Sequence, residues 1–163
     1  MDRTGVLFVC LGNICRSPLA EGIFLDLVRK RGVADRFDVD SCGTGGWHAG
    51  EPADARSVAI AKRHGLKLVH EARTFDPDLD PARFAWIIAM DRSNVRNLLH
   101  AGVDPARVRL MRSFDPAMTG KRENDMDVPD PYDWPGDGFE EVYQTLAAAC
   151  AGLVEVLMDE IQS

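Results

Sequence analysis

The stretch VLFVCLGNICRSPLAEGIF, residues 6–24, decides how the rest of this sequence is interpreted. It begins with a continuous apolar run that ends at Cys10, which is typical of a strand buried on both faces. Gly12 and Asn13 follow, and both residue types tolerate the backbone angles of a tight loop. Ser-Pro then opens a helical pattern at Pro18, because proline fits the first helical turn, where its missing N–H costs nothing. The stretch therefore predicts a strand, a tight loop and a helix in direct succession.

The same alternation of strand and helix continues along the chain. Apolar or alternating runs predict strands at 5–10, 37–43, 85–90 and 108–114. Apolar periodicity with capping and stop residues predicts helices at 18–31, 54–64, 91–101 and 137–161. Repeated strand–helix units imply a parallel sheet with helices on both faces. We expect an α/β fold of the flavodoxin-like or Rossmann-like type, with a four-stranded parallel sheet and one domain over residues 1–163.

Composition and charge limit the partners of this chain. Its 163 residues carry a net charge of −7, which repels phosphates at long range, so we expect no nucleic-acid partner and no membrane partner. No apolar run approaches the roughly 20 residues of a transmembrane helix. The N-terminus lacks the apolar core and cleavage site of a signal peptide. We expect a cytoplasmic monomer, although export by a route without a signal peptide stays open.

The four cysteines do not have the spacing of a zinc site, and reduced thiols fit a cytoplasmic chain. We therefore expect no metal and no other cofactor. Cys42 and Cys150 are interpreted as small buried apolar residues.

The loop between Cys10 and Arg16 has the properties of an anion site. Its backbone can direct successive N–H groups inward, and it ends at a helix N-terminus, which carries partial positive charge. The planar guanidinium of Arg16 can bind two oxygens of one anion. Thiolates form more readily beside cations and helix N-termini, so Cys10 is a candidate nucleophile facing a bound phosphate. The pattern indicates phosphoryl transfer to sulfur.

This stretch resembles the opening motif of the low-molecular-weight protein tyrosine phosphatases, V-C-x-G-N-x-C-R-S-P. The resemblance extends along the chain through GTGGWHAGEPAD, HGLKLVHEAR, AMDRSN and DPYDWPGDGFEEVY, in the same order. It implies hydrolysis of phosphotyrosine and other aryl phosphates through a phosphocysteine on Cys10. It also implies phosphotyrosine proteins as substrates, with inorganic phosphate and vanadate as competitive inhibitors.

The resemblance assigns roles around this nucleophile. Arg16 would clamp the phosphate together with the amides of the loop residues Leu11, Gly12, Asn13, Ile14 and Cys15. Ser17 would donate a hydrogen bond to the thiolate. Asn13 would hold the shape of the loop through Ser41 and His70, and the alternative for His70 is an ordinary surface histidine. Cys15 would either form a protective disulfide with Cys10 under oxidant or simply pack the loop.

The general acid is harder to assign, because the chain has five Asp-Pro pairs, at residues 76, 80, 104, 115 and 130. Asp130 differs because Tyr132 and Trp134 follow it, and the resemblance places the acid in such an Asp-Pro-aromatic motif. The sequence D-P-Y-D-W-P-G departs from the common family wording D-P-Y-Y-G, so Asp133 stands at the substrate rim. Leu11, Trp47 and Tyr132 would wall the slot for an aromatic ring, although Trp47 alternatively anchors its loop.

Three rival functions share part of this pattern. A thioredoxin-linked arsenate reductase shares the fold but needs two further cysteines, and none lies between Cys42 and Cys150. A protein arginine phosphatase of the same family typically carries threonine where this loop has Ile14. A phosphocarrier or phosphoanion-binding module would need the nucleophile and the anion loop but no acid.

Overall fold

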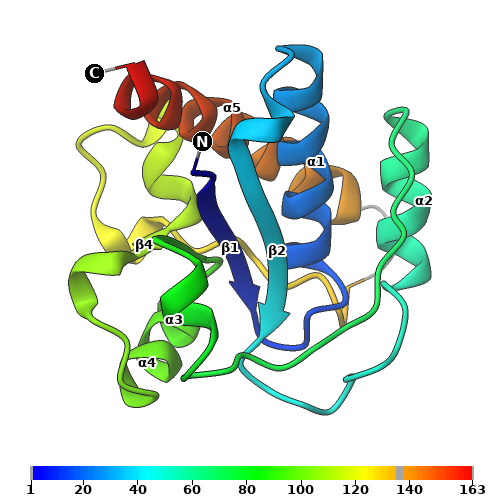
Figure 1. Cartoon of the computed structure of the whole chain (residues 1–163). Helices are drawn as coiled ribbons and strands as arrows, with labels where there is room; N and C mark the ends of the chain where they lie inside the picture. The colour runs from blue at the N-terminus through cyan, green and yellow to red at the C-terminus, as the bar shows by residue number, and fades with distance from the viewer. Residues whose placement is uncertain (1, 135–137, 163) are drawn as a thin grey trace.

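The sheet is parallel throughout and has the strand order β2-β1-β3-β4 (Figure 1). Its strands are β1 (Thr4–Cys10), β2 (Phe37–Gly43), β3 (Trp86–Ala89) and β4 (Val108–Leu110). In this computed structural model, residues 2–134 and 138–162 are described. The four-stranded parallel sheet is the one predicted, and the predicted strand 37–43 has the observed bounds.

Helices cover both faces of the sheet, as predicted. They are α1 (Arg16–Lys30), α2 (Ala55–Arg63), α3 (Asp80–Arg83), α4 (Arg92–His100) and α5 (Gly138–Gln162). Figure 1 shows α1, α2 and α5 grouped on one side of the strands, with α3 and α4 together on the other. Successive side chains of a strand point to opposite faces, so Phe8 and Ile88 join the core under α1 and α5. Leu7 and Ile87 join the smaller core that contains Leu98 of α4.

Two predicted boundaries differ from the observed ones by two residues or more. The predicted strand 108–114 stops at Leu110, because the chain then forms a 3-10 turn, Met111–Phe114, that packs against α5. The close approach needs Gly152 of α5, where an added Cβ would overlap the Phe114 carbonyl. The helix predicted from residue 18 already begins at Arg16, since the Leu19 amide donates to the Cys15 carbonyl. The short helix α3 was not predicted, and the predicted start of the last helix at 137 lies outside the described residues.

The helix α5 is long and apolar enough to cross a membrane by length and composition, although the sequence suggested no such segment. Half of its apolar window is buried in the protein, and side chains such as Leu146 and Leu153 pack against the main core. A core helix reaches this hydropathy because it is covered by other elements. The feature is therefore weak support for a membrane span.

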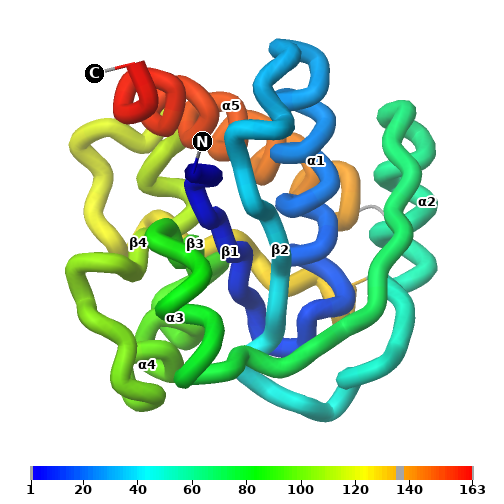
Figure 2. The backbone as a smooth tube through the Cα atoms, in the orientation of Figure 1, coloured from blue at the N-terminus to red at the C-terminus, as the bar shows by residue number. Residues whose placement is uncertain are grey.

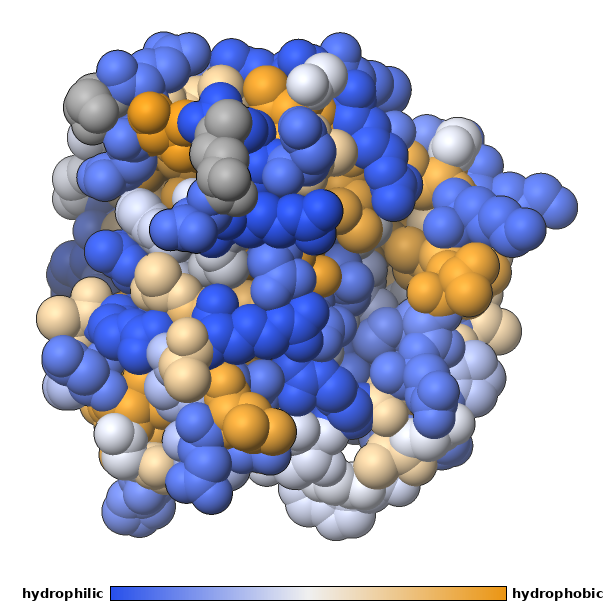
Figure 3. Space-filling view, in the orientation of Figure 1, coloured by the Kyte–Doolittle hydropathy of each residue, from blue (hydrophilic) through white to orange (hydrophobic). Residues whose placement is uncertain are grey.

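Charged pairs cover the exposed edge of the sheet at β2. Asp38 binds Arg83 at 2.7 Å, and Asp40 binds Arg73 at 3.1 Å. Charge on an edge strand opposes pairing with another chain. Figure 3 shows mainly hydrophilic residues over the middle of this face.

The loops that follow the strands meet at the carboxyl edge of the sheet, where open α/β sheets bind ligands (Figure 2). The loop after β2 is tied to the loop after β1, because the Thr44 amide donates to the Cys10 carbonyl and the Gly45 amide to the Leu11 carbonyl, both at 2.9 Å. The loop that carries Asp130 is tied to the residue that follows β3, because the Val128 amide donates to the Met90 carbonyl at 2.8 Å. These links bring the three candidate segments to one edge.

Candidate active site

The Cys10 thiol lies at the last position of β1 and is 3% exposed. Its Sγ accepts a hydrogen bond from the Asn13 amide at 3.3 Å and lies 3.0 Å from the Ser17 hydroxyl. Both partners come from the loop and helix that follow the strand. Two hydrogen-bonding groups within seven residues of Cys10 therefore lie against its thiol.

Asn13 fixes the shape of this loop. It is the non-glycine residue with positive φ, 58°, among the described residues, and it is fully buried. Its side-chain amide donates to Ser17 at 2.8 Å and to Ser41 at 3.0 Å, and its Oδ1 accepts from the Arg73 amide at 3.0 Å. A left-handed conformation of this kind persists because the surrounding bonds determine it.

His70 and Ser41 both form hydrogen bonds with this asparagine. The Asn13 carbonyl accepts from His70 Nε2 at 2.7 Å, and burial lowers the pKa of this histidine, which favours the neutral ring. The Ser41 hydroxyl donates to Glu21 at 2.6 Å, and burial raises the pKa of Glu21 to about 7. A hydrogen-bonded chain thus runs from Glu21 to the nucleophile loop.

Arg16 is buried at the first position of α1, and its guanidinium has three partners. Its Nη1 donates to Asp91 at 2.7 Å and to the Val128 carbonyl at 2.9 Å, and its Nη2 lies 3.5 Å from Asp130 Oδ2. The candidate cation and the candidate acid are therefore adjacent, although 114 residues separate them in the sequence.

Asp130 lies in a tight turn rather than on a helix or strand. Its Oδ1 accepts from the Tyr132 amide at 3.1 Å, and the Trp134 amide donates to the Pro131 carbonyl at 3.0 Å. Its side chain is 41% exposed. One carboxylate oxygen thus orders the turn while the other faces Arg16.

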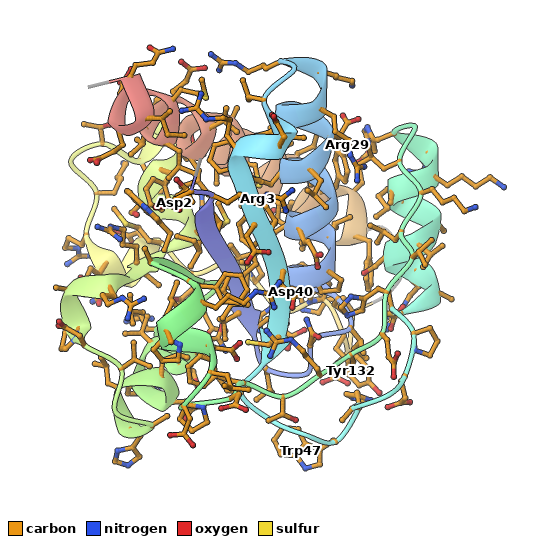
Figure 4. The ribbon with its side chains drawn as sticks, in the orientation of Figure 1. Asp2, Arg3, Arg29, Asp40, Trp47 and Tyr132 are labelled. Atoms are coloured by element: carbon orange, nitrogen blue, oxygen red, sulfur yellow. The ribbon has the colours of Figure 1, made fainter. Side chains whose placement is uncertain are left out.

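A cavity of about 150 Å³ opens above the thiol. Its walls are Cys10, Leu11, Gly12, Ile14, Cys15, Arg16, Trp47, His48, Asp130 and Tyr132. Trp47 is 73% exposed and Tyr132 is 45% exposed, and Figure 4 shows both at the end of the sheet where β1 and β2 terminate. The exposure of Trp47 favours a wall of the slot over a packed loop anchor.

His48 and Asp91 belong to this region, and the sequence analysis did not single them out. The His48 ring lies over Gly12 so closely that an added Cβ there would be 2.9 Å from its Cδ2, and Glu51 binds its Nδ1 at 2.6 Å. A Cβ at residue 12 would therefore displace the His48 ring, and residue 12 does not have a positive φ. Asp91 lies two residues after the end of β3, in AMDRSN, and polar residues after parallel strands are a signal for the site.

Metal ligation has no support in the described residues, where no group of three or more His, Cys, Asp or Glu side chains is placed to hold an ion. A thiol on the wall of a cavity, beside a buried guanidinium and the Asn13 amide, suits an anion that sulfur can attack. On an α/β sheet edge, this chemistry defines the class of cysteine-dependent phosphatases.

Comparison with known proteins identifies the family. The family model described as low molecular weight phosphotyrosine protein phosphatase matches residues 5–163. The low molecular weight protein-tyrosine-phosphatase of Streptomyces coelicolor is 43% identical over 160 residues, which cover 96% of this chain and 95% of the relative. The human low molecular weight phosphotyrosine protein phosphatase is 38% identical over 154 residues, which cover 92% and 93%.

Solved structures give the same result. The protein tyrosine phosphatase of Entamoeba histolytica, with Hepes in its active site, superposes with a TM-score of 0.88 at 33% identity and covers 96% of this chain and 98% of that one. YfkJ from Bacillus subtilis superposes with a TM-score of 0.87 at 36% identity and covers 98% of both chains. This chain belongs to the low molecular weight phosphotyrosine protein phosphatase family, which confirms the resemblance found in the sequence.

Proposed function

We propose that this protein hydrolyses phosphotyrosine in phosphoproteins through a phosphocysteine on Cys10. The observation that carries the proposal is the convergence of Cys10, Arg16 and Asp130 on the wall of one cavity. A nucleophile, a fixed cation and a proton donor are what transfer of a phosphoryl group from a phenol requires. Residues 1–163 act in this proposal as one phosphatase domain.

In the first step the Cys10 thiolate attacks phosphorus while Arg16 and the loop amides bind the phosphoryl oxygens. The S–P bond forms as the P–O bond to the phenol breaks, and protonated Asp130 gives its proton to the phenolate oxygen. In the second step the Asp130 carboxylate takes a proton from water, whose oxygen attacks phosphorus. The S–P bond then breaks, inorganic phosphate leaves, and the Cys10 thiolate accepts a hydrogen bond from Ser17.

The aromatic ring of the substrate would lie between Leu11, Trp47 and Tyr132, with Ile14 deeper in the slot. These apolar walls suit a phenyl ring, and their exposed ends suit a side chain that projects from a protein surface. No cofactor takes part in either step. Phosphate and vanadate would compete with the substrate because they occupy the same loop. We expect a cytoplasmic monomer without nucleic-acid or membrane partners.

The first experiment is hydrolysis of p-nitrophenyl phosphate at about pH 6 with EDTA, with the wild type beside Cys10→Ser. We expect activity in the first and none in the second, because the hydroxyl of serine is a far weaker nucleophile than a thiolate. Equal activity in both would assign the reaction to another nucleophile. Absence of activity in both would favour a phosphoanion-binding module, and arsenate reduction would then be measured.

A second experiment separates a phosphatase from a phosphocarrier. General acid catalysis contributes about 10²–10⁴-fold, so Asp130→Ala should lower turnover of phenyl phosphate strongly. The loss should be smaller for p-nitrophenyl phosphate, whose leaving group needs less protonation. A phosphocarrier would be phosphorylated equally well without Asp130.

The substrate residue is tested with matched peptides. One structural relative, superposing with a TM-score of 0.81 at 35% identity, is described as the Drosophila arginine phosphatase. Ile14 at the slot wall favours a flat aromatic ring over a polar guanidinium, so we expect faster release of phosphate from phosphotyrosine than from phosphoarginine peptides. The reverse order would assign the arginine activity to this protein.

A further inference from the structure

Arg56, the second residue of α2, reaches the turn that carries Asp130. Its Nη2 donates to the Tyr132 carbonyl at 2.8 Å, and its Nη1 donates to the Trp134 carbonyl at 3.0 Å. Its guanidinium also lies over the rings of Phe139, at 4.6 Å, and Tyr132, at 5.9 Å. Among the described residues, these two hydrogen bonds are the ones that link residues 131–134 to the rest of the protein. The other hydrogen bonds of these residues lie within the turn 130–134.

The Arg56 guanidinium is itself held in place by Asp54. The carboxylate accepts from Arg56 Nε at 3.0 Å and from Nη2 at 2.9 Å, and it also caps α2 by accepting from the Arg56 amide at 2.8 Å. The hydrogen bonds from Arg56 hold the pKa of Asp54 below its usual value. A planar guanidinium fixed along one edge has little freedom, so its remaining N–H groups have a defined direction.

The start of α2 is hydrogen-bonded to the nucleophile loop. The Asp54 amide donates to the Ile14 carbonyl at 2.8 Å, and the Ser57 hydroxyl donates to the Cys15 carbonyl at 3.4 Å. The guanidinium therefore has a fixed position relative to the loop that holds Cys10. It connects this loop to the turn of Asp130, although Arg56 is 76 and 78 residues from its two carbonyl partners in the sequence.

We propose that Arg56 is a positioning residue for the general acid. It holds the backbone of the turn 130–134 so that the Asp130 carboxyl faces the cavity with Cys10. The inference rests on the proposed function, because it assigns Arg56 an effect that acts through Asp130. Arg56 is absent from the cavity wall, so it has no direct contact with a ligand there.

The substitution Arg56→Ala releases the two carbonyls and should weaken protonation of the leaving group. We expect kcat/KM for phenyl phosphate to fall about 10- to 100-fold, which is part of the roughly 10²–10⁴-fold that a general acid contributes. For p-nitrophenyl phosphate we expect a loss below about 3-fold, since this phenolate leaves with little protonation. The inhibition constant of vanadate should not change, because Arg16 and the loop amides remain in place.

Two further variants test whether the effect passes through Asp130. In the Asp130→Ala background, Arg56→Ala should cause no additional loss on phenyl phosphate, because the acid it positions is absent. Arg63→Ala is the matched control, since Arg63 lies on the same helix and forms only a long ion pair, 4.0 Å, with Glu140 among the described residues. Arg56→Lys keeps the charge but cannot bind Asp54 and two carbonyls together. It should show the same substrate-dependent loss, and it replaces Arg56→Ala if the alanine variant fails to fold.

Several results would overturn the inference. Equal losses on both phenolic substrates, or weaker binding of vanadate, would assign Arg56 to the nucleophile loop. A further loss in the Asp130→Ala background, or an Arg56→Lys variant equal to Arg63→Ala, would also contradict it. Failure of the proposed function is distinguishable, because Cys10→Ser and Asp130→Ala would then leave the wild-type activity unchanged.

Discussion

The Asp91 carboxylate lies 2.7 Å from Nη1 of the buried Arg16 guanidinium and holds the candidate phosphate clamp in orientation. Asp91 also caps α4, where its side chain accepts from the Asn94 amide. One carboxylate therefore joins the end of β3, the start of α4 and the nucleophile loop. A buried cation that loses such a partner is left with an uncompensated charge.

Asp91→Ala should therefore destabilise the protein by about 3 kcal/mol, somewhat less than a fully unpaired charge because the Val128 carbonyl and Asp130 remain. Urea unfolding measures the difference. Asp104→Ala is the control, because Asp104 caps a short 3-10 turn with one bond to the Ala106 amide and has no buried partner. We expect this control to lower the free energy of unfolding by about 1 kcal/mol. Equal losses would mean that Asp91 acts only as a helix cap.

Asn13 combines a left-handed backbone with three side-chain hydrogen bonds, and two substitutions separate these contributions. Asn13→Gly keeps the backbone conformation and loses the bonds, with an expected cost of about 2 kcal/mol. Asn13→Ala should cost about 1 kcal/mol more, because a Cβ disfavours positive φ. Urea unfolding of both variants compares their free energies of unfolding. An alanine variant as stable as the glycine variant would show that the positive φ of residue 13 does not cost stability.

The partly buried Glu21 gives stability a pH dependence. Its pKa in the folded protein is about 7, raised from 4.5 by burial, so between these values the folded state holds a proton that the unfolded state has released. Its contribution to stability is therefore complete below about pH 4.5 and is lost as the pH rises through 7. The full loss should be on the order of 3 kcal/mol.

Glu21→Gln should remove this dependence, and urea unfolding between pH 5 and about 8 measures it. Asp26→Asn is the control on the same helix, because Asp26 forms a surface pair with Lys30. A wild-type curve parallel to that of Glu21→Gln would show that the Glu21 proton is not retained on folding.

Cys15 should be unreactive in the folded protein. Burial, together with the Asp54 carboxylate, raises its pKa to about 12, so its thiol is protonated at neutral pH. Iodoacetamide at about pH 7 should label Cys10 alone, with protection by phosphate, because the thiolate is the reactive form. Peptide mass spectrometry of the wild type and Cys10→Ser checks the site, and denatured protein should label at all four cysteines. Labelling of Cys15 in native Cys10→Ser would contradict the expectation.

The same burial bears on a disulfide between Cys10 and Cys15. Both thiols are free in this structure, and a protonated thiol attacks an oxidised partner slowly. The disulfide therefore stays a prediction, and any formation should accelerate as the pH rises.

Local sequence was sufficient for the strand, loop and helix around Cys10, because consecutive residues supply the buried run, the left-handed Asn13 and the helix start. It was also sufficient for the parallel sheet, since strand–helix units have few arrangements. It failed at residues 111–114, where packing against α5 ended the strand. Burial by distant elements is not visible in a local pattern.

The sequence by itself determined which side chains can perform the chemistry: a thiol, an arginine and an Asp-Pro-aromatic acid at characteristic spacing. Only the tertiary structure decided how these groups are held. Asp91, Glu21 and Arg56 act on the site through partners that are tens of residues away in the chain. Hydrogen bonds and ion pairs depend on distance in space, and chain folding alone brings such pairs within 3 Å.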